Sequence, residues 1–269
     1  GHTMRRLQSM VVPFALVLFF WSLHPVLAAA PDVQEIVSKA NHMAYYQGND
    51  GKARVEMTIT DGQGRTRNKS LTILRKNMDD QDREQRFYVY FHRPSDERGT
   101  VFMVWKHVGE DDDRWLYLPA LDVTKRIAAS DERTSFVGSH FFYEDVSGRG
   151  IQEDEHTLQE TTDNYYVLKN TPKKPELVEF DHYIMYVHKS TFLPVKAEYY
   201  RDGTKYREMS VLKVEEIQGK TTITQQKMSD LESGGHTVLE FKDVSYNNDL
   251  PDDIFTERYL RRAPRQYLR

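Results

Sequence analysis

The sequence predicts a mainly β protein of the α+β class, in which a single strongly curved antiparallel sheet forms an incomplete barrel around an apolar cavity. Three observations lead to this fold class. Apolar and polar residues alternate over many short segments, and glycine-containing turns separate consecutive segments. The second half of the chain shows no alternation of strands with helices, which argues against a parallel sheet. A sheet of about ten antiparallel strands curls toward a barrel or half-barrel, and one face can stay open under a few short helices that act as lids.

The first predicted element of the folded domain is an amphipathic helix from residue 31 to about residue 44. Its apolar residues recur at helical spacing: Val33, Ile36, Val37 and Ala40. After this helix, apolar and polar residues alternate with a period of two, which is typical of strands. Strands are predicted over residues 54–59, 67–76, 86–92, 99–107, 114–118, 164–170, 177–188, 194–201, 205–216, 220–230 and 237–246.

A second helical segment is predicted between residues 128 and 143. Its second half is too apolar for a surface loop. Five of its side chains must be buried: Phe136, Val137, Phe141, Phe142 and Tyr143. They either fill the core of the sheet or form a lid over a lipid-sized pocket.

The first thirty residues are predicted to be a targeting segment and not part of the folded domain. Residues 1–3 resemble an expression scar, and residues 4–30 have the positive start, short apolar run and small residues of a Sec-type signal peptide, cleaved near Ala30. The apolar run is too short to span a bilayer, which needs about 20 residues. If the segment is retained, we expect it to pack in an apolar groove. Residues 31–269 form one predicted domain.

The composition excludes several classes of protein. A net charge of −4 and a pI near 6.2 argue against nucleic-acid binding, which requires a surplus of basic residues. A mean hydropathy of −0.70 excludes a membrane protein with many spans. The absence of cysteine excludes disulfides, thiolate metal sites and an anchor on an N-terminal lipidated cysteine. The mature protein is therefore expected to be soluble, with transient membrane contact.

The sequence indicates no enzyme, cofactor or metal site. His182 and His188 lie six residues apart on one strand, which separates them by about 20 Å. The acidic run from 110 to 113 lacks the spacing of a calcium loop and is interpreted as a hairpin tip. Two alternatives stay open: a zinc site built from His140, His156 or His236, and a hydrolase with a carboxylate cluster in the cavity.

Glu144 and Asp145 are adjacent and should face opposite ways, so they do not form a paired-carboxylate site. One of them is expected to pair with Arg126 or Arg149. The C-terminal segment is rich in arginine and tyrosine. It either contacts anionic head groups or an acidic partner, or is a frayed end whose arginine stems cover aromatic rings.

Several motifs resemble a known family. They are Trp115–Leu121 (WLYLPAL), Lys125–Ala128 (KRIA), Ser135–Ser139 (SFVGS), Phe142–Asp145 (FYED) and the closing Leu250–Thr256 (LPDDIFT). In order and spacing they resemble the periplasmic outer membrane lipoprotein-sorting protein family, which is similar to the lipoprotein carriers LolA and LolB. None of these motifs is catalytic.

The resemblance implies a carrier of lipoprotein acyl chains or of another lipid in the periplasm of a Gram-negative bacterium. It also implies an inner-membrane permease of the RND type as a possible partner. A different function has the same architecture: an envelope-stress sensor or accessory subunit that binds a membrane protein and carries no cargo. A pocket filled by its own side chains would favour the sensor.

The cavity is predicted to be lined by the inward-facing side chains of the first strands, and the parity of each strand is a guess because a slip of one residue exchanges the faces. The predicted lining is Val55, Met57, Ile59, Phe87, Val89, Phe91, Phe102, Val104, Trp115 and Tyr117. The predicted lid is Phe136, Val137, Phe141, Phe142 and Tyr143.

Overall fold

The computed structural model describes residues 24–25 and 31–269. The chain divides into two units, residues 1–30 and 31–269, and the second carries the fold described below. The predicted expression scar, the signal peptide and its packing in a groove lie outside the described residues, apart from His24 and Pro25.

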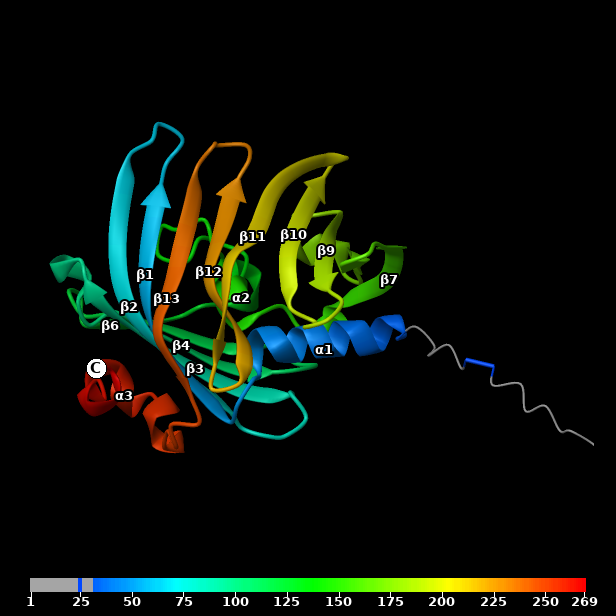
Figure 1. Cartoon of the computed structure of the whole chain (residues 1–269). Helices are drawn as coiled ribbons and strands as arrows, with labels where there is room; N and C mark the ends of the chain where they lie inside the picture. The colour runs from blue at the N-terminus through cyan, green and yellow to red at the C-terminus, as the bar shows by residue number, and fades with distance from the viewer. Residues whose placement is uncertain (1–23, 26–30) are drawn as a thin grey trace, which may run out of the picture. The chain divides into compact units, whose positions relative to one another are not determined.

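Within residues 31–269, thirteen strands form a single antiparallel sheet that curves strongly without closing (Figure 1). The order across the sheet is β6-β5-β4-β3-β2-β1-β13-β12-β11-β10-β9-β8-β7. The strands are β1 (Asp50–Thr60), β2 (Thr66–Asn77), β3 (Glu84–Arg93), β4 (Val101–His107), β5 (Asp113–Leu118), β6 (Val123–Arg126), β7 (Asp154–Thr161), β8 (Tyr165–Pro172), β9 (His182–His188), β10 (Pro194–Arg201), β11 (Thr204–Ile217), β12 (Lys220–Asp230) and β13 (His236–Tyr246). The predicted fold class is confirmed.

The chain enters this sheet in its middle. Strands β1 to β6 step outward to one edge through hairpins, residues 127–153 cross to the opposite edge, and β7 to β13 step back until β13 pairs with β1. Breaks in register, for example between Lys52 and Arg54 of β1, mark β-bulges that help the strands to bend. The sequence analysis missed β6 and β7 and began β9 too early, because a 3₁₀ turn (Pro175–Leu177) precedes that strand.

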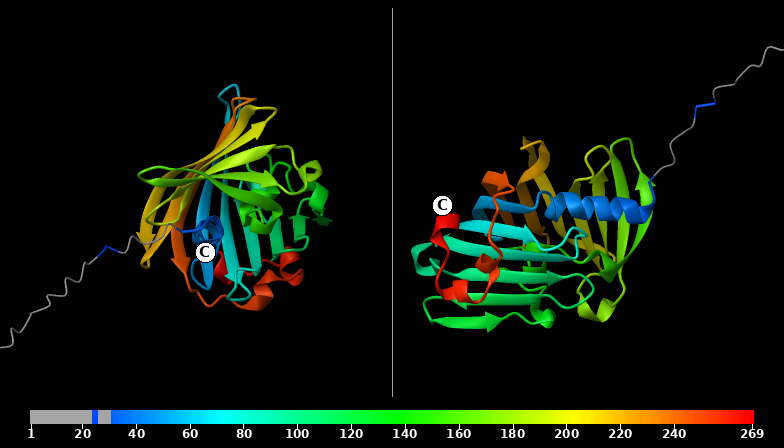
Figure 2. Two further views of the ribbon diagram at one scale, coloured as in Figure 1. Left: turned by 90° about the vertical axis from the view of Figure 1, so that its right-hand side faces the viewer. Right: turned by 90° about the horizontal axis from the view of Figure 1, so that it is seen from below.

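Helix α1 (Val33–Tyr45) confirms the first predicted helix. The Asp32 side chain caps it by accepting a hydrogen bond from the Glu35 amide at 2.7 Å. Its apolar face, with Ile36, Val37 and Ala40, packs on β8 and β9. The helix lies within the curve of the sheet (Figure 2) and covers part of the concave face.

The helix predicted for residues 128–143 is wrong. A 3₁₀ turn (Ala129–Asp131) is followed by a tight loop, closed by a bridge between Ser135 and Phe142. Val137 and Gly138 both have positive φ, at 47° and 77°, a backbone that helices exclude and that glycine favours. The only α-helix that follows in this region of the described chain is the short α2 (Tyr143–Ser147).

The sheet carries a core on each face, because alternate residues of β2 to β5 point in opposite directions. The concave core lies under the loop and α2. The convex core is covered by the C-terminal segment, residues 250–269 (Figure 2), which includes η5 (Asp252–Phe255), α3 (Arg258–Arg261) and η6 (Arg265–Tyr267). This segment is packed and not frayed: Phe255 and Leu268 are buried. Two further 3₁₀ turns are Ser95–Glu97 and Ile151–Glu153. No described helix has the length and hydropathy to cross a membrane.

Candidate ligand cavity

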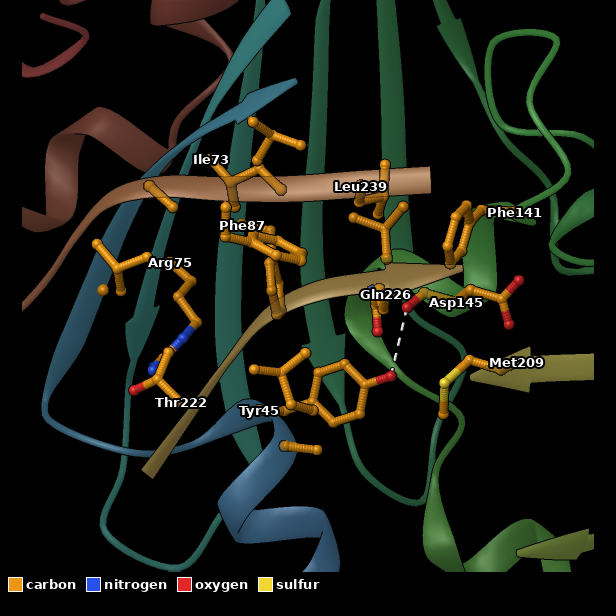
Figure 3. Close-up of a pocket in the computed structure, with 18 of the residues that line it drawn as sticks. Tyr45, Ile73, Arg75, Phe87, Phe141, Asp145, Met209, Thr222, Gln226 and Leu239 are labelled. Atoms are coloured by element: carbon orange, nitrogen blue, oxygen red, sulfur yellow. Dashed lines mark hydrogen bonds between the residues drawn. The ribbon is translucent and has the colours of Figure 1, made fainter. Parts of the chain in front are cut away.

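A cavity of about 260 Å³ lies between the concave face, the C-terminal end of α1, the loop and α2 (Figure 3). Every strand from β9 to β13 contributes to its wall, as do β1, β2 and β3. Its lining residues are Met43, Ala44, Tyr45, Gln47, Gly51, Lys52, Ala53, Val55, Met57, Leu71, Ile73, Arg75, Phe87, Phe136, Phe141, Asp145, Val146, Met185, Pro194, Ala197, Tyr199, Met209, Thr222, Ile223, Gln226, Met228, Leu239, Phe241, Val244 and Tyr246.

The wall is mostly apolar because the strands present alternate residues to it. Leu71 and Ile73 of β2 face inward two residues apart, as Leu239 and Phe241 do on β13. Five methionines contribute flexible thioethers, which adapt to irregular ligands. These are Met43, Met57, Met185, Met209 and Met228.

Helix α1 and helix α2 meet at the cavity through one hydrogen bond and through the Tyr45 ring, which packs on Gly148 at the end of α2. The Tyr45 hydroxyl donates to the Asp145 carbonyl oxygen at 3.4 Å (Figure 3). The Asp145 carboxylate accepts from the Phe142 amide at 2.7 Å and from Arg207, so that helix α2 is also joined to β11. Burial, and then the nearby Asp145, raise the pKa of Tyr45, so its hydroxyl stays protonated as a donor. The contact between the two helices is long for an O–H···O bond, and hence weak.

The structure brings only part of the predicted lining to the cavity. Val55, Met57 and Phe87 line it, together with Phe141 and Phe136 from the predicted lid. The other predicted residues of β1, β3 and β4 have the predicted parity but lie in the packed concave core. These are Ile59, Val89, Phe91, Phe102 and Val104. Two rings of the loop and α2 pack on Phe102: the ring centroid of Phe136 lies 5.3 Å and that of Tyr143 5.2 Å from the Phe102 centroid.

The predicted parity of β5 is wrong, since Trp115 and Tyr117 point to the convex face. Trp115 packs on Trp105 at 5.0 Å between ring centroids, and the Tyr117 hydroxyl donates to Asp122. The concave face of β5 carries Leu116 and the buried Arg114. Both faces of β5 are covered, so both contain large apolar side chains and the alternation does not identify the inner one.

The remaining predicted lid residues do not reach the cavity. Val137 packs half-buried against the concave core. The Phe142 ring lies under two guanidinium groups, with Arg207 at 3.8 Å and Arg133 at 5.1 Å from its centroid. The loop therefore combines the two roles considered for it: most of it fills the core and Phe136 and Phe141 close one side of the cavity.

The sequence analysis missed the half of the wall that comes from α1 and from β9 to β13. Alternation had placed strands there, so Leu239, Phe241 and Met228 were accessible from the same period-two signal as Val55 and Met57. Nothing in the sequence showed that β13 pairs with β1, which is the contact that brings both groups to one cavity.

A cluster of buried charges lies behind the cavity and fixes α2. Glu144 pairs with Arg133 at 2.8 Å and with Arg149 at 3.4 Å, which confirms the predicted Arg149 partner. Glu179 forms a bidentate pair with Arg133. Burial alone would raise the pKa of Glu179, but the hydrogen bonds from Arg133 and Tyr206 outweigh it and lower the pKa to about 2.

Two of the three histidines considered for a zinc site have hydrogen-bond partners within the protein, and among the described residues none of the three belongs to a group of potential metal ligands. His156 contacts the Asn170 side chain and the Ile151 carbonyl, both at 2.6 Å. His140 contacts the Thr237 hydroxyl at 2.8 Å. The acidic run at 110–113 connects β4 to β5 and ends in the first residue of β5, and Asp112 pairs with Arg114 at 3.0 Å.

Comparison with known proteins supports the same architecture. A family model described as that of an uncharacterized protein matches residues 83–262, which is well over half of the chain. A DUF1329 family protein from Desulfovibrio piger is 28% identical, with a TM-score of 0.76, over 85% of this chain and 98% of that one. No curated protein matches the chain significantly.

Two further solved structures carry the names that the sequence motifs suggested. An outer membrane lipoprotein-sorting protein domain from Vibrio parahaemolyticus, described as putative, is 24% identical with a TM-score of 0.76, over 86% of this chain and 98% of that one. A LolA superfamily protein from Nitrosomonas europaea is 25% identical with a TM-score of 0.66, over 86% of this chain and all of that one. The predicted resemblance is confirmed.

Proposed function

The chain belongs to the family whose model matches residues 83–262 and resembles a DUF1329 family protein in sequence and fold, and we propose that it is a non-enzymatic periplasmic carrier of lipid. It binds an acyl chain of a lipoprotein, or of another lipid, in the concave cavity and carries it between membranes. The names of the solved relatives support this function, and the predicted signal peptide supports the location.

The observation that carries the proposal is the unfilled apolar cavity. Each buried methylene contributes about 0.8 kcal/mol, so an apolar cavity needs little polar chemistry to hold an acyl chain. Its volume of about 260 Å³ lies just below the roughly 300–1,000 Å³ of typical ligand pockets, which suits one chain better than several. A sensor without cargo would have a core filled by its own side chains, so the cavity favours the carrier.

Release of the cargo requires a competing site or a change of shape. We place the opening of the cover where Tyr45 meets Asp145, because the hydrogen bond between them is long. The proposed partner for loading or unloading is an inner-membrane permease of the RND type, as the resemblance of the sequence motifs implies.

The function is tested by filling the cavity. Ala197→Trp places an indole in the wall from β10, whereas Ala120→Trp adds the same side chain at an exposed turn. Excluding two or three methylenes should cost about 2 kcal/mol, so a fluorescent acyl probe should bind Ala197→Trp more than tenfold more weakly than the wild type. Ala120→Trp should bind normally.

Equal binding by the wild type and Ala197→Trp would overturn the proposal, provided that thermal unfolding shows a folded variant. Ala53→Phe fills the same cavity from β1 and replaces Ala197→Trp if that variant unfolds. Native mass spectrometry of protein isolated from a bacterial periplasm should show a discrete bound lipid or acylated peptide. A bare protein that also takes up no acyl probe would contradict the carrier function.

A further inference from the structure

One end of the cavity holds a partly buried cation, the guanidinium of Arg75. Arg75 follows Leu71 and Ile73 at two-residue intervals on β2, so it points to the same concave face. Figure 3 shows its guanidinium extending toward Thr222, away from the end formed by Phe141 and Asp145. The cavity therefore has an apolar body with a charged group at one end.

The sheet is built to accommodate this guanidinium. Arg75, Gly51 and Tyr246 lie opposite one another on β2, β1 and β13. A Cβ at Gly51 would lie 3.1 Å from the Arg75 Nε and 3.2 Å from its Cζ, so the guanidinium lies flat on a glycine where a larger residue would crowd it. The Tyr246 ring centroid lies 5.8 Å from the Arg75 Cζ and contributes a cation–π contact.

No carboxylate neutralises Arg75 among the described residues. Its Nη2 donates to the Gln47 carbonyl oxygen, and its Nη1 is buried without a hydrogen bond. Asp50 is the carboxylate that most favours the charged form of Arg75. It already uses both oxygens to accept hydrogen bonds from Asn248 and from the Leu250 amide at 2.7–3.0 Å. Burial lowers the pKa of Arg75, but a guanidinium stays charged in proteins.

Other arginines withdrawn from solvent are treated differently by this fold. Each of four has at least one carboxylate partner, although single nitrogens of two of them also lack a hydrogen bond. The four are Arg114, Arg133, Arg149 and Arg207, with side chains 1–14% exposed. A buried charge without a counter-charge is costly, and structures normally pair it. Arg75 lacks the anion that the fold supplies elsewhere, and it faces a cavity.

We propose that Arg75 anchors the anionic head group of the cargo, so that the carrier takes an acyl chain that ends in a carboxylate or a phosphate. This inference rests on the proposed function and narrows it from lipids in general to anionic amphiphiles. The head group binds at the Arg75 end and the acyl chain extends along the apolar wall toward Phe141.

The test compares ligands of equal chain length that differ in head-group charge. The protein from a periplasmic extract is delipidated and titrated with dodecanoate and with dodecanol, and lysophosphatidic acid is compared with a monoacylglycerol of the same chain. A charged hydrogen bond in a partly buried site contributes about tenfold or more in affinity, so both anions should bind at least about tenfold more tightly than their neutral partners. A preference for one anion only identifies carboxylate or phosphate as the source.

Arg75→Met keeps much of the side-chain length and removes the charge. It should lose the preference for the anions and leave the affinity for dodecanol within about twofold, while Arg75→Lys should keep part of the preference. Equal affinity of the wild type for dodecanoate and dodecanol would overturn the inference and leave the carrier function intact. Binding of none of the four ligands would overturn the carrier function itself. The wild-type comparison decides between these outcomes even if Arg75→Met unfolds.

Discussion

The two faces of the sheet show how one alternating sequence makes both a solid core and a cavity. On the convex face, the C-terminal segment covers β2 to β5 with side chains that are almost fully buried, such as Phe255 and Leu260. On the concave face, α1, the loop and α2 leave about 260 Å³ unfilled. The strands are the same, so the difference arises from what covers them.

The two coverings also differ in how they are attached. The C-terminal segment on the convex face follows β13 directly in the chain. It is fixed by hydrogen bonds from the sheet, such as the one from the Tyr88 hydroxyl to the Tyr259 carbonyl oxygen at 2.7 Å. The concave cover comes from two separate parts of the chain that meet at Tyr45 and Asp145. A covering in two parts can separate, which suits a face that binds and releases a ligand.

A matched pair of leucines tests this difference most strongly. Leu74 and Leu71 lie three residues apart on β2, are at most 1% exposed, and point to the convex and the concave face. Truncation of either to alanine should lower the free energy of unfolding by about 2–5 kcal/mol. Leu74→Ala should have the larger effect, because Leu71 already borders empty space and loses fewer packing contacts. Denaturant unfolding measures both values.

The same pair should separate stability from ligand binding. Leu71→Ala enlarges the cavity and should change the affinity for an acyl probe, whereas Leu74→Ala should leave that affinity unchanged wherever the protein is folded. Equal changes in probe affinity would contradict the distinction between a binding face and a structural face.

Local pattern was sufficient to predict a curved antiparallel sheet, all of its strands except β6 and β7, and the first helix. Strands such as 54–59 show the alternation of apolar and polar residues, and turns such as Asp61–Gly64 show glycine next to polar residues. Both patterns are local and need no tertiary information. The guessed parity matches the structure for β1, β3 and β4. Because β3 and β4 carry large buried residues on both faces, such as Phe87 and Tyr88, the pattern itself did not decide it.

Long-range pairing could not be predicted in the same way. Trp115 and Tyr117 were assigned to the cavity because they are large and apolar, but the C-terminal segment some 140 residues later covers them. The sequence did not indicate Arg75 as a cavity residue, because an arginine on a strand is normally solvated. Only the pairing of β1 with β2 and β13 places it at a cavity. The sequence motifs indicated the related proteins but not the residues that line the cavity.

The second prediction uses the titration of one acid, Glu132, on the concave side of the sheet. Burial, and then the neighbouring Glu144, raise the pKa of Glu132 from 4.5 to about 8. The folded protein therefore retains a proton that the unfolded chain releases, so stability should fall as the pH rises between about 5 and 8, by about 1–3 kcal/mol. Lys106 has the opposite sign above that range, because burial lowers its pKa to about 8 and stability should recover toward its ordinary pKa of 10.5.

Glu132→Gln should flatten the fall in stability between pH 5 and 8, as measured by denaturant unfolding across that range. Glu215→Gln, at an exposed position of β11, is the matched control and should leave the slope unchanged. Hydrogen exchange should show the loosening first in α2 amides, because Glu144 lies in that helix. A slope that survives in Glu132→Gln would assign the pH dependence to other groups.

The smallest expected effect concerns the cap of α1. Asp32→Ala removes the oxygen that accepts from the Glu35 amide, and should cost about 1 kcal/mol. Because α1 covers the concave face, its amides should exchange faster, while those of the C-terminal segment on the convex face should not change. Asp32→Ser retains a capping oxygen and should restore the exchange of α1 to nearly its original rate. Faster exchange of both coverings in Asp32→Ala would show that the two faces open together, and would remove the distinction between a separable cover and a fixed one.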